Sequence, residues 1–223
     1  PETATIAYRA WDATHGAPGD TADVTNGGGE TAFGVATDSA SLTVKEVNDP
    51  PVISGFVSPA NYTENGPPAP IVGGATVFDP DSADFAGGRL EVAITSGGTA
   101  SDRLLIREGN GISLAGDTVI YDSGGPRLIG SLTIDGWLLT VHFTTLDASQ
   151  EAAQALLRSV AYENVSDNPS TDKRRIQISL SDGDGGHQTR TVTQTVTVQP
   201  VNDPPLAEPD AYSTVSGQKL VLS

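Results

Sequence analysis

One five-residue segment, Val-Asn-Asp-Pro-Pro, occurs twice in the chain, at residues 47–51 and again at residues 201–205. A run of alternating apolar and polar residues precedes each copy, at residues 41–44 and at residues 191–198. This alternation is typical of a β-strand with one buried face. Each copy therefore closes a final strand, and the chain is predicted to be an array of repeats built on the same strands.

The correspondence extends upstream of the two copies. Two strand-like runs each end at an aspartate, Asp12 and Asp182, and a glycine-rich turn follows each of them. The repetition divides the chain into three predicted parts: residues 1–50 as the C-terminal part of one repeat, residues 51–204 as a complete repeat, and residues 205–223 as the first strand of a third.

The charge balance narrows the kinds of partner. The chain has 12 Lys and Arg against 28 Asp and Glu, a formal net charge of −16, whereas binding to nucleic acid or to an anionic membrane relies on a basic surface. Cations are the expected ligands. The chain has no cysteine, so bound metal is one of the few remaining means of stapling a small extracellular domain. No apolar run approaches the roughly 18 residues of a membrane span, so we expect no membrane insertion.

A β-hairpin is the clearest local signal. Alternating runs flank the pair Asp135-Gly136, which is a favoured two-residue turn. A turn centred there pairs Ile134 with Trp137 and places Trp137 and Phe143 on the same apolar face. That face needs a second sheet to pack against, so we expect Trp137 to be buried.

One helix is predicted, over residues 149–158, with Asp147 or Ser149 as its N-cap. Ala152 and Leu156 lie one helical turn apart and form its apolar face. The remaining apolar runs are short and are predicted to be strands. The sequence therefore predicts an all-β fold, an antiparallel Greek-key β-sandwich with one short crossover helix.

Acidic residues gather where the predicted strands end. Asp79 and Asp81 directly follow an apolar strand, and their side chains share a face if the segment is extended. Asp182 ends another strand, and the pair Asn48-Asp49 leads into the first strand of the central repeat. Calcium takes about six to eight oxygen ligands from several segments, so these residues predict a calcium site at one end of the sandwich.

Each of these segments also has an interpretation without metal. The Asp-Pro-Asp sequence at residues 79–81 and the Asp-Gly-Asp-Gly-Gly sequence at residues 182–186 are favourable turn sequences in any loop. The Asn-Asp-Pro-Pro segments are rigid linkers with or without an ion, because proline restricts the backbone. The repetition predicts a joint, and the calcium prediction depends on the acidic residues around it.

The acidic segments resemble those of cadherin repeats. Val-Asn-Asp-Pro-Pro resembles the Asp-x-Asn-Asp-Asn linker, Asp79-Pro80-Asp81 the Asp-x-Asp pair, Ser181-Asp182-Gly183 the Ala-x-Asp-x-Gly segment, and Tyr62-Thr63-Glu64-Asn65 the Pro-Glu-Asn segment. The chain as a whole is similar to the cadherin-like tandem repeats of large bacterial surface adhesins and calcium-dependent secreted proteins. It departs from that pattern in its helix, its extra hairpin and its Asn-Asp-Pro-Pro linker.

The resemblance implies a cadherin- or immunoglobulin-like sandwich with two groups of calcium ligands. The first group, at the joint between the first and second repeats, is Asn48, Asp49, Asp79, Asp81 and Asp182. The second group, at the joint between the second and third repeats, is Glu64, Asn202, Asp203 and, through the likeness of Leu146-Asp147 to the start of Leu-Asp-Arg-Glu, Asp147.

The expected function is mechanical. A shared calcium ion would draw the carboxylates of neighbouring repeats together and stiffen the array. We therefore expect a calcium-binding structural and adhesive repeat of a large extracellular protein, whose partners are neighbouring repeats of the same chain and a cell-surface or other surface ligand. No motif of a known nucleophile, zinc protease or P-loop occurs, so no enzyme activity is expected. The rivals are a carbohydrate-binding module and a spacer attached to a secreted hydrolase.

Overall fold

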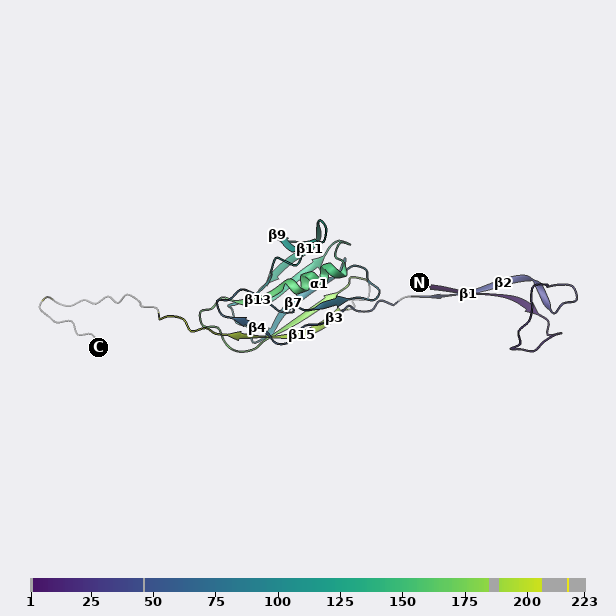
Figure 1. The fold of residues 1–223 in the computed structure, drawn as a ribbon, viewed down its shortest axis with the longest axis horizontal. Coiled ribbons are helices and arrows are strands. Elements are labelled where there is room, and N and C mark those ends of the chain that lie inside the picture. Colours follow the sequence, from purple (N-terminus) through teal and green to yellow (C-terminus); the bar gives the residue numbers. More distant parts are fainter. Residues whose placement is uncertain (1, 46, 185–188, 206–215, 217–223) are drawn as a thin grey trace. The chain divides into compact units, whose positions relative to one another are not determined.

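The computed structural model describes residues 2–45, 47–184, 189–205 and 216. The chain forms two compact units, Pro1–Val47 and Asn48–Ser223, and each is described by itself (Figure 1). Of the predicted third repeat, residues 205–223, all but Pro205 and Ser216 lie outside the described residues. No described helix has the length and apolar character needed to cross a membrane.

The first unit is a two-stranded antiparallel sheet of β1 (Glu2–Trp11) and β2 (Phe33–Val44). Alternate residues point to opposite faces, so Ile6 and Tyr8 share a face with Leu42, and all three side chains are exposed. Leu42 stands five residues before Val47, as Val196 stands five residues before Val201. Val196 is fully buried in the second unit. The strand that precedes the repeated pentapeptide is therefore present in both units, with its apolar face covered only in the second.

The described residues of the second unit form a β-sandwich with one helix. Its elements are β3 (Val52–Ser54), β4 (Ala60–Thr63), β5 (Ala69–Pro70), β6 (Thr76–Phe78), β7 (Arg89–Ser96), β8 (Asp102–Ile106), β9 (Ile112–Ala115), β10 (Thr118–Asp122), β11 (Pro126–Asp135), β12 (Leu138–Phe143), α1 (Gln150–Ser159), β13 (Val160–Asn164), β14 (Arg174–Ser181) and β15 (Thr189–Gln199). An eight-stranded sheet has the order β4-β15-β14-β7-β12-β11-β10-β9, and the smaller sheets are β5-β13-β8 and β3-β6. All pairs are antiparallel except β15 with β4. The predicted all-β sandwich with one helix is confirmed.

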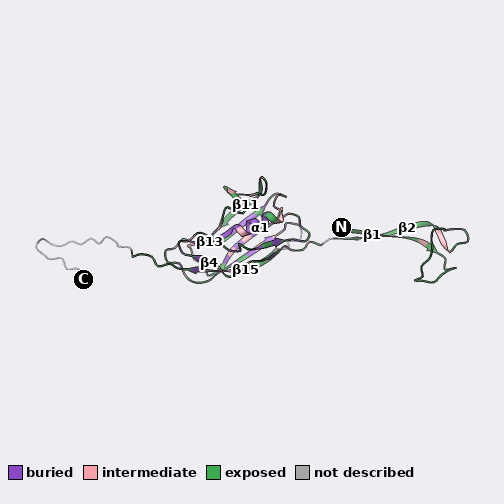
Figure 2. Ribbon diagram, viewed as in Figure 1, coloured by how far each residue is buried: buried purple, intermediate pink, exposed green. Residues whose placement is uncertain are grey.

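The core of this unit lies between the large sheet and the smaller elements, where the buried residues gather in Figure 2. Along β14, buried Ile176 and Ile178 alternate with exposed Arg175 and Gln177, which is the two-residue period of a strand with one face inside. Burying each such isoleucine is worth about 1.5–3 kcal/mol. The predicted apolar runs therefore do form the inner faces of strands.

The predicted helix is confirmed as α1, and of the two candidate caps Ser149 is the N-cap. The Ser149 Oγ accepts a hydrogen bond from the Ala152 N–H at 3.3 Å. Ala152 and Leu156 are fully buried, as their spacing predicted. The cap matters because the first N–H groups of a helix have no partner within it.

Removing this cap gives a first testable outcome. The Ser149→Ala variant is expected to lose about 1 kcal/mol of unfolding free energy, whereas Ser149→Asn, which keeps a capping oxygen, loses only a fraction of that. Urea unfolding in the presence of a chelator measures both. An unchanged midpoint for Ser149→Ala would contradict the capping role.

The predicted hairpin is present, but its turn is displaced by one residue. Asp135 pairs with Leu138 and Ile134 with Leu139, so the turn is formed by Gly136 and Trp137. The φ of Gly136 is +59°, which the first central residue of a type II′ turn requires. The predicted pairing of Ile134 with Trp137 and the burial of Trp137 are therefore wrong: Trp137 is 41% exposed and its Nε1 donates to the carbonyl of Thr99.

Candidate metal centre

The loop after β6 is organised by Asp79. One of its carboxylate oxygens, Oδ1, accepts hydrogen bonds from the backbone N–H groups of Asp81 at 3.2 Å and Ser82 at 2.9 Å. These bonds close a turn, so the extended conformation that would place Asp79 and Asp81 on one face is not adopted. Asp79 is 2% exposed and Asp81 is exposed. The turn interpretation of Asp-Pro-Asp therefore holds, and it leaves one buried carboxylate at the end of the strand.

Two segments distant in sequence meet this loop. Asp182, 1% exposed, follows β14 and its Oδ2 accepts from the side-chain amide of Asn48 at 2.8 Å. The backbone N–H of Asp49 donates to the Asp81 Oδ2 at 3.0 Å. The structure therefore brings all five residues of the first predicted group to one end of the second unit, with residues 48–49 held by both loops.

The Asp79 carboxylate carries an unfavourable buried charge. The other oxygen of the Asp79 carboxylate, Oδ2, is buried and has no hydrogen-bond partner among the described residues. Burial raises the pKa of Asp79 above its usual value, and the charge of Asp182 raises it further. A buried carboxylate with a free oxygen beside a second buried carboxylate is the arrangement that a bound cation would stabilise.

The carboxylates alone do not form a ready-made site. Within the part of the chain that the structure describes, no three His, Cys, Asp or Glu side chains are grouped so that they could hold a metal ion. Calcium ligands also include backbone and amide oxygens and water. Residues 48–49 meet the two loops through N–H groups, the Asn48 side-chain amide and the Asp49 backbone, so their oxygens would have to turn toward a bound ion. The fit therefore depends on two buried carboxylates and on that segment.

Three further side chains lie around the loop and were not among the predicted calcium ligands. Ser82 Oγ donates to the Asp184 Oδ2 at 2.9 Å, and the Asp184 N–H donates to the Asp182 Oδ1 at 3.1 Å. Gln150, at the start of α1, bonds the backbone of the Asp79 loop. The second aspartate of Asp-Gly-Asp signalled Asp184, whereas nothing in the sequence distinguished Gln150 or Ser82.

The second predicted group is only partly assembled. Glu64 is 3% exposed; its Oε2 accepts from the Val201 N–H at 2.6 Å, and its Oε1 is buried without a partner among the described residues. Asn202 and Asp203 follow directly but are exposed. Glu64 thus contacts the segment that follows the last strand, β15. In the same way, the first group includes the segment that leads into β3, the first strand of the unit.

Asp147 is placed away from Glu64. It forms an ion pair with Arg127 at 2.8 Å and precedes Gln150, whose side chain contacts the loop of Asp79. From there the helix runs antiparallel to the chain between Pro70 and Asp79, so Asp147 and Glu64 lie toward opposite ends of the unit. Its assignment to the second group is therefore not supported by its position.

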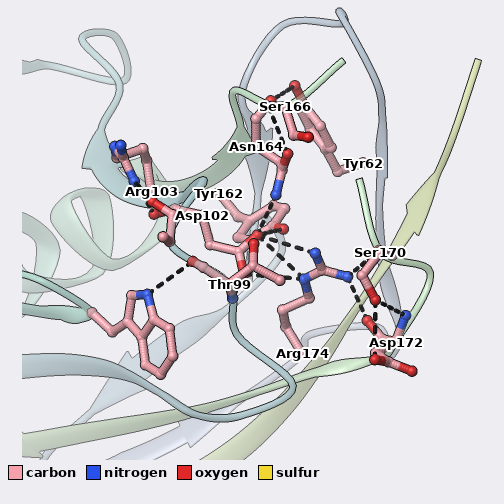
Figure 3. A network of polar contacts seen from close by, with 12 residues as sticks. Tyr62, Thr99, Asp102, Arg103, Tyr162, Asn164, Ser166, Ser170, Asp172 and Arg174 are labelled. Atoms are coloured by element: carbon pink, nitrogen blue, oxygen red, sulfur yellow. Dashed lines mark hydrogen bonds and ion pairs between the residues drawn. The ribbon is translucent and has the colours of Figure 1, made fainter. Parts of the chain in front are cut away.

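A separate polar cluster lies inside the unit (Figure 3). The side chains of Asp102 and Arg174 are fully buried and 3.2 Å apart. The Asp102 carboxylate also accepts from the Thr99 N–H at 2.6 Å, the Asn164 amide at 2.6 Å and the Tyr162 hydroxyl. With every oxygen satisfied, this cluster has a structural role, tying the loops before β8 and β14 together.

The cluster sets the charge state of its members. Burial alone would raise the pKa of Asp102, but the hydrogen bonds from Tyr162, Thr99, Asn164 and Arg174 outweigh it and hold the pKa below its usual value. Burial and the Asp102 charge raise the pKa of Tyr162 well above its ordinary range. At neutral pH Asp102 is therefore ionised and Tyr162 remains a hydrogen-bond donor.

The likeness of the chain to known proteins is weak. No protein-family model matches the chain, and no curated protein does. Among solved structures, the chain is similar to the Enterococcus faecalis MSCRAMM ACE, described as binding its ligands by the collagen Hug Model, with 10% identity and a TM-score of 0.28. The match covers 76% of this chain and 57% of that one, so the chain spans little more than half its length. A likeness this distant carries no argument about function.

Proposed function

We propose that the second unit is a calcium-binding β-sandwich module of an extracellular structural or adhesive array. The observation that carries the proposal is the unpartnered, buried Oδ2 of Asp79 beside the buried carboxylate of Asp182. Two buried negative charges without a counter-ion lower the stability of the fold. A divalent cation between them would turn that penalty into a stabilising contact.

The donor set favours calcium among the common cations. Asp79 and Asp182 would supply carboxylate oxygens, and Asn48, Asp49 and Asp81 lie against the same two loops. Their carboxylate and amide oxygens are hard donors and include no nitrogen or sulfur ligand of the kind that zinc and copper prefer, so they suit calcium better. Magnesium is less suited, because it demands a small octahedral shell and gives up its water reluctantly.

The mechanical consequence follows from the place of Asn48 and Asp49 in the sequence. They directly follow the first unit and are the first residues of the second. An ion bound by this segment and by the loops of Asp79 and Asp182 would restrict the backbone between consecutive repeats. Glu64 would act in the same way on the exit segment at Val201. In this proposal a series of such modules forms a calcium-stiffened rod outside the cell and carries a surface ligand-binding function.

Calorimetric titration with calcium, and separately with magnesium, tests the proposal. The wild-type protein is expected to bind calcium with a Kd of roughly 10⁻⁴–10⁻³ M, the range of extracellular modules, and magnesium more weakly. Asp182→Asn should weaken the binding about tenfold or more, whereas Asp135→Asn, at the exposed hairpin turn, should leave it unchanged. Equal affinity in wild type and Asp182→Asn, or no binding to the wild type, would refute the proposed site.

A further inference from the structure

We propose that Gln150, on the first turn of α1, is the positioning residue of the cation loop, an inference that rests on the proposed function. Its Oε1 accepts from the Asp79 N–H at 3.0 Å, and its Nε2 donates to the carbonyls of Asp79 at 2.8 Å and Ser82 at 2.7 Å. One side chain thus satisfies three backbone groups of the loop that carries the unpartnered Asp79 oxygen.

Three side chains of α1, spaced by four residues, contact the backbone of residues 75–82. Gln154, four residues after Gln150, accepts from the Val77 N–H at 3.2 Å, and Arg158, four residues further, donates to the Ala75 carbonyl at 2.6 Å. Residues spaced by four lie on one face of a helix, so this face follows the backbone from Ala75 to Ser82. Only the contact of Gln150 reaches the loop, whereas the other two hold β6 and the residue before it.

The contacts of Gln150 determine where the Asp79 carboxylate points. They fix the Asp79 backbone on both sides, while Asp79 Oδ1 is held by the N–H groups of Asp81 and Ser82. With the backbone and Oδ1 fixed, Oδ2 has one direction left. A cation therefore meets a preorganised ligand and does not have to order the loop as it binds. Without Gln150, the three backbone groups would form hydrogen bonds with water. A cation would then have to order the loop as it binds, which lowers its affinity.

The test compares Gln150→Ala with its matched control, Gln154→Ala, in the full chain. Both variants remove a glutamine from the same face of the same helix, and both should lower the urea midpoint in chelator. Calcium affinity by calorimetry separates them: Gln150→Ala should weaken binding by about 10- to 100-fold, the usual effect of losing a residue that orients a metal ligand, and Gln154→Ala should bind as the wild type does.

The outcomes distinguish the two proposals. If the wild type binds calcium, Asp182→Asn weakens the binding and Gln150→Ala binds as the wild type does, the positioning role is wrong and the calcium site stands. If Gln154→Ala weakens binding as much as Gln150→Ala, the effect is one of general helix stability and the positioning role again fails. If the wild type binds no calcium, the proposed function fails and this inference fails with it.

Discussion

Replacing Arg174 with methionine is expected to lower the unfolding free energy of the second unit by about 3–5 kcal/mol, the usual effect of removing one member of a buried ion pair. Methionine fills a similar volume but leaves the Asp102 charge buried and unpaired. It also frees the carbonyls of Ser170 and Asp172, which accept from Arg174. Urea unfolding measures the loss, and a Trp11→Phe background restricts the tryptophan signal to Trp137 in the second unit.

The chain offers a matched control in the neighbouring residue. Arg175 is exposed on the opposite face of β14, so Arg175→Met should change the unfolding free energy by less than about 0.5 kcal/mol. Adding Asp102→Asn to Arg174→Met should lose less than the sum of the two single changes, because the second change removes the unpaired charge. Additive losses would show that the two side chains do not interact in the folded protein.

The same cluster gives a pH dependence. The folded-state pKa of Asp102 lies below its unfolded value, so the folded state favours the ionised form. Its contribution to stability is therefore fully present above the unfolded pKa of about 3.9 and is lost as the pH falls through the folded pKa. Unfolding curves between pH 7 and the acid range should show a steeper loss of stability in the wild type than in the variant that lacks both charges.

The Asp79→Asn variant is expected to be more stable than the wild type in chelator and less stable in calcium. Asparagine keeps the oxygen that accepts from the Asp81 and Ser82 N–H groups but removes a buried charge whose pKa burial and Asp182 both raise. Because a raised pKa means that the fold disfavours the ionised form, neutralising it should gain about 1 kcal/mol at neutral pH. This is roughly 2–4 °C in Tm for a unit of this size.

Calcium should reverse that order. At a concentration of about 10–100 times the Kd, binding stabilises the wild type by about 1.4–2.7 kcal/mol, or roughly 3–10 °C. The Asp79→Asn variant should lose most of this response, and Asp135→Asn should keep it. Thermal unfolding in chelator and in calcium gives all six values. If Asp79→Asn were less stable than the wild type in both conditions, the carboxylate would have a purely structural role.

Local patterns predicted the elements well, because each depends on residues close in sequence. In β14 every second residue is buried, and in α1 a capping serine precedes apolar residues spaced by four. Both patterns can be seen within a single segment of the sequence. The hairpin shows the limit of this reasoning: the apolar side of Leu139 and Phe143 was predicted correctly, but the turn centre depended on the φ that Gly136 adopts. Because the turn lies one residue later than predicted, Trp137 is part of the turn and is exposed, whereas it was predicted to be buried.

Contacts between distant segments were predictable only where a repeated pattern marked them. The pentapeptide and the strand-ending aspartates brought Asn48 and Asp182 into one group, and the structure shows the two side chains hydrogen-bonded. No such mark exists for Asp102 and Arg174, which are 72 residues apart in sequence. Gln150 resembles any other polar residue at the start of a helix until the fold brings α1 alongside the loop after β6.

Calcium-loaded crystals of the protein, with diffraction data collected to record the anomalous signal of calcium, test the central claim most directly. We expect an anomalous peak within about 2.3–2.6 Å of the Asp79 Oδ2 and of a carboxylate oxygen of Asp182, the distances of calcium–oxygen bonds. Clear density for both side chains in saturating calcium, with no anomalous peak between them, would contradict the account.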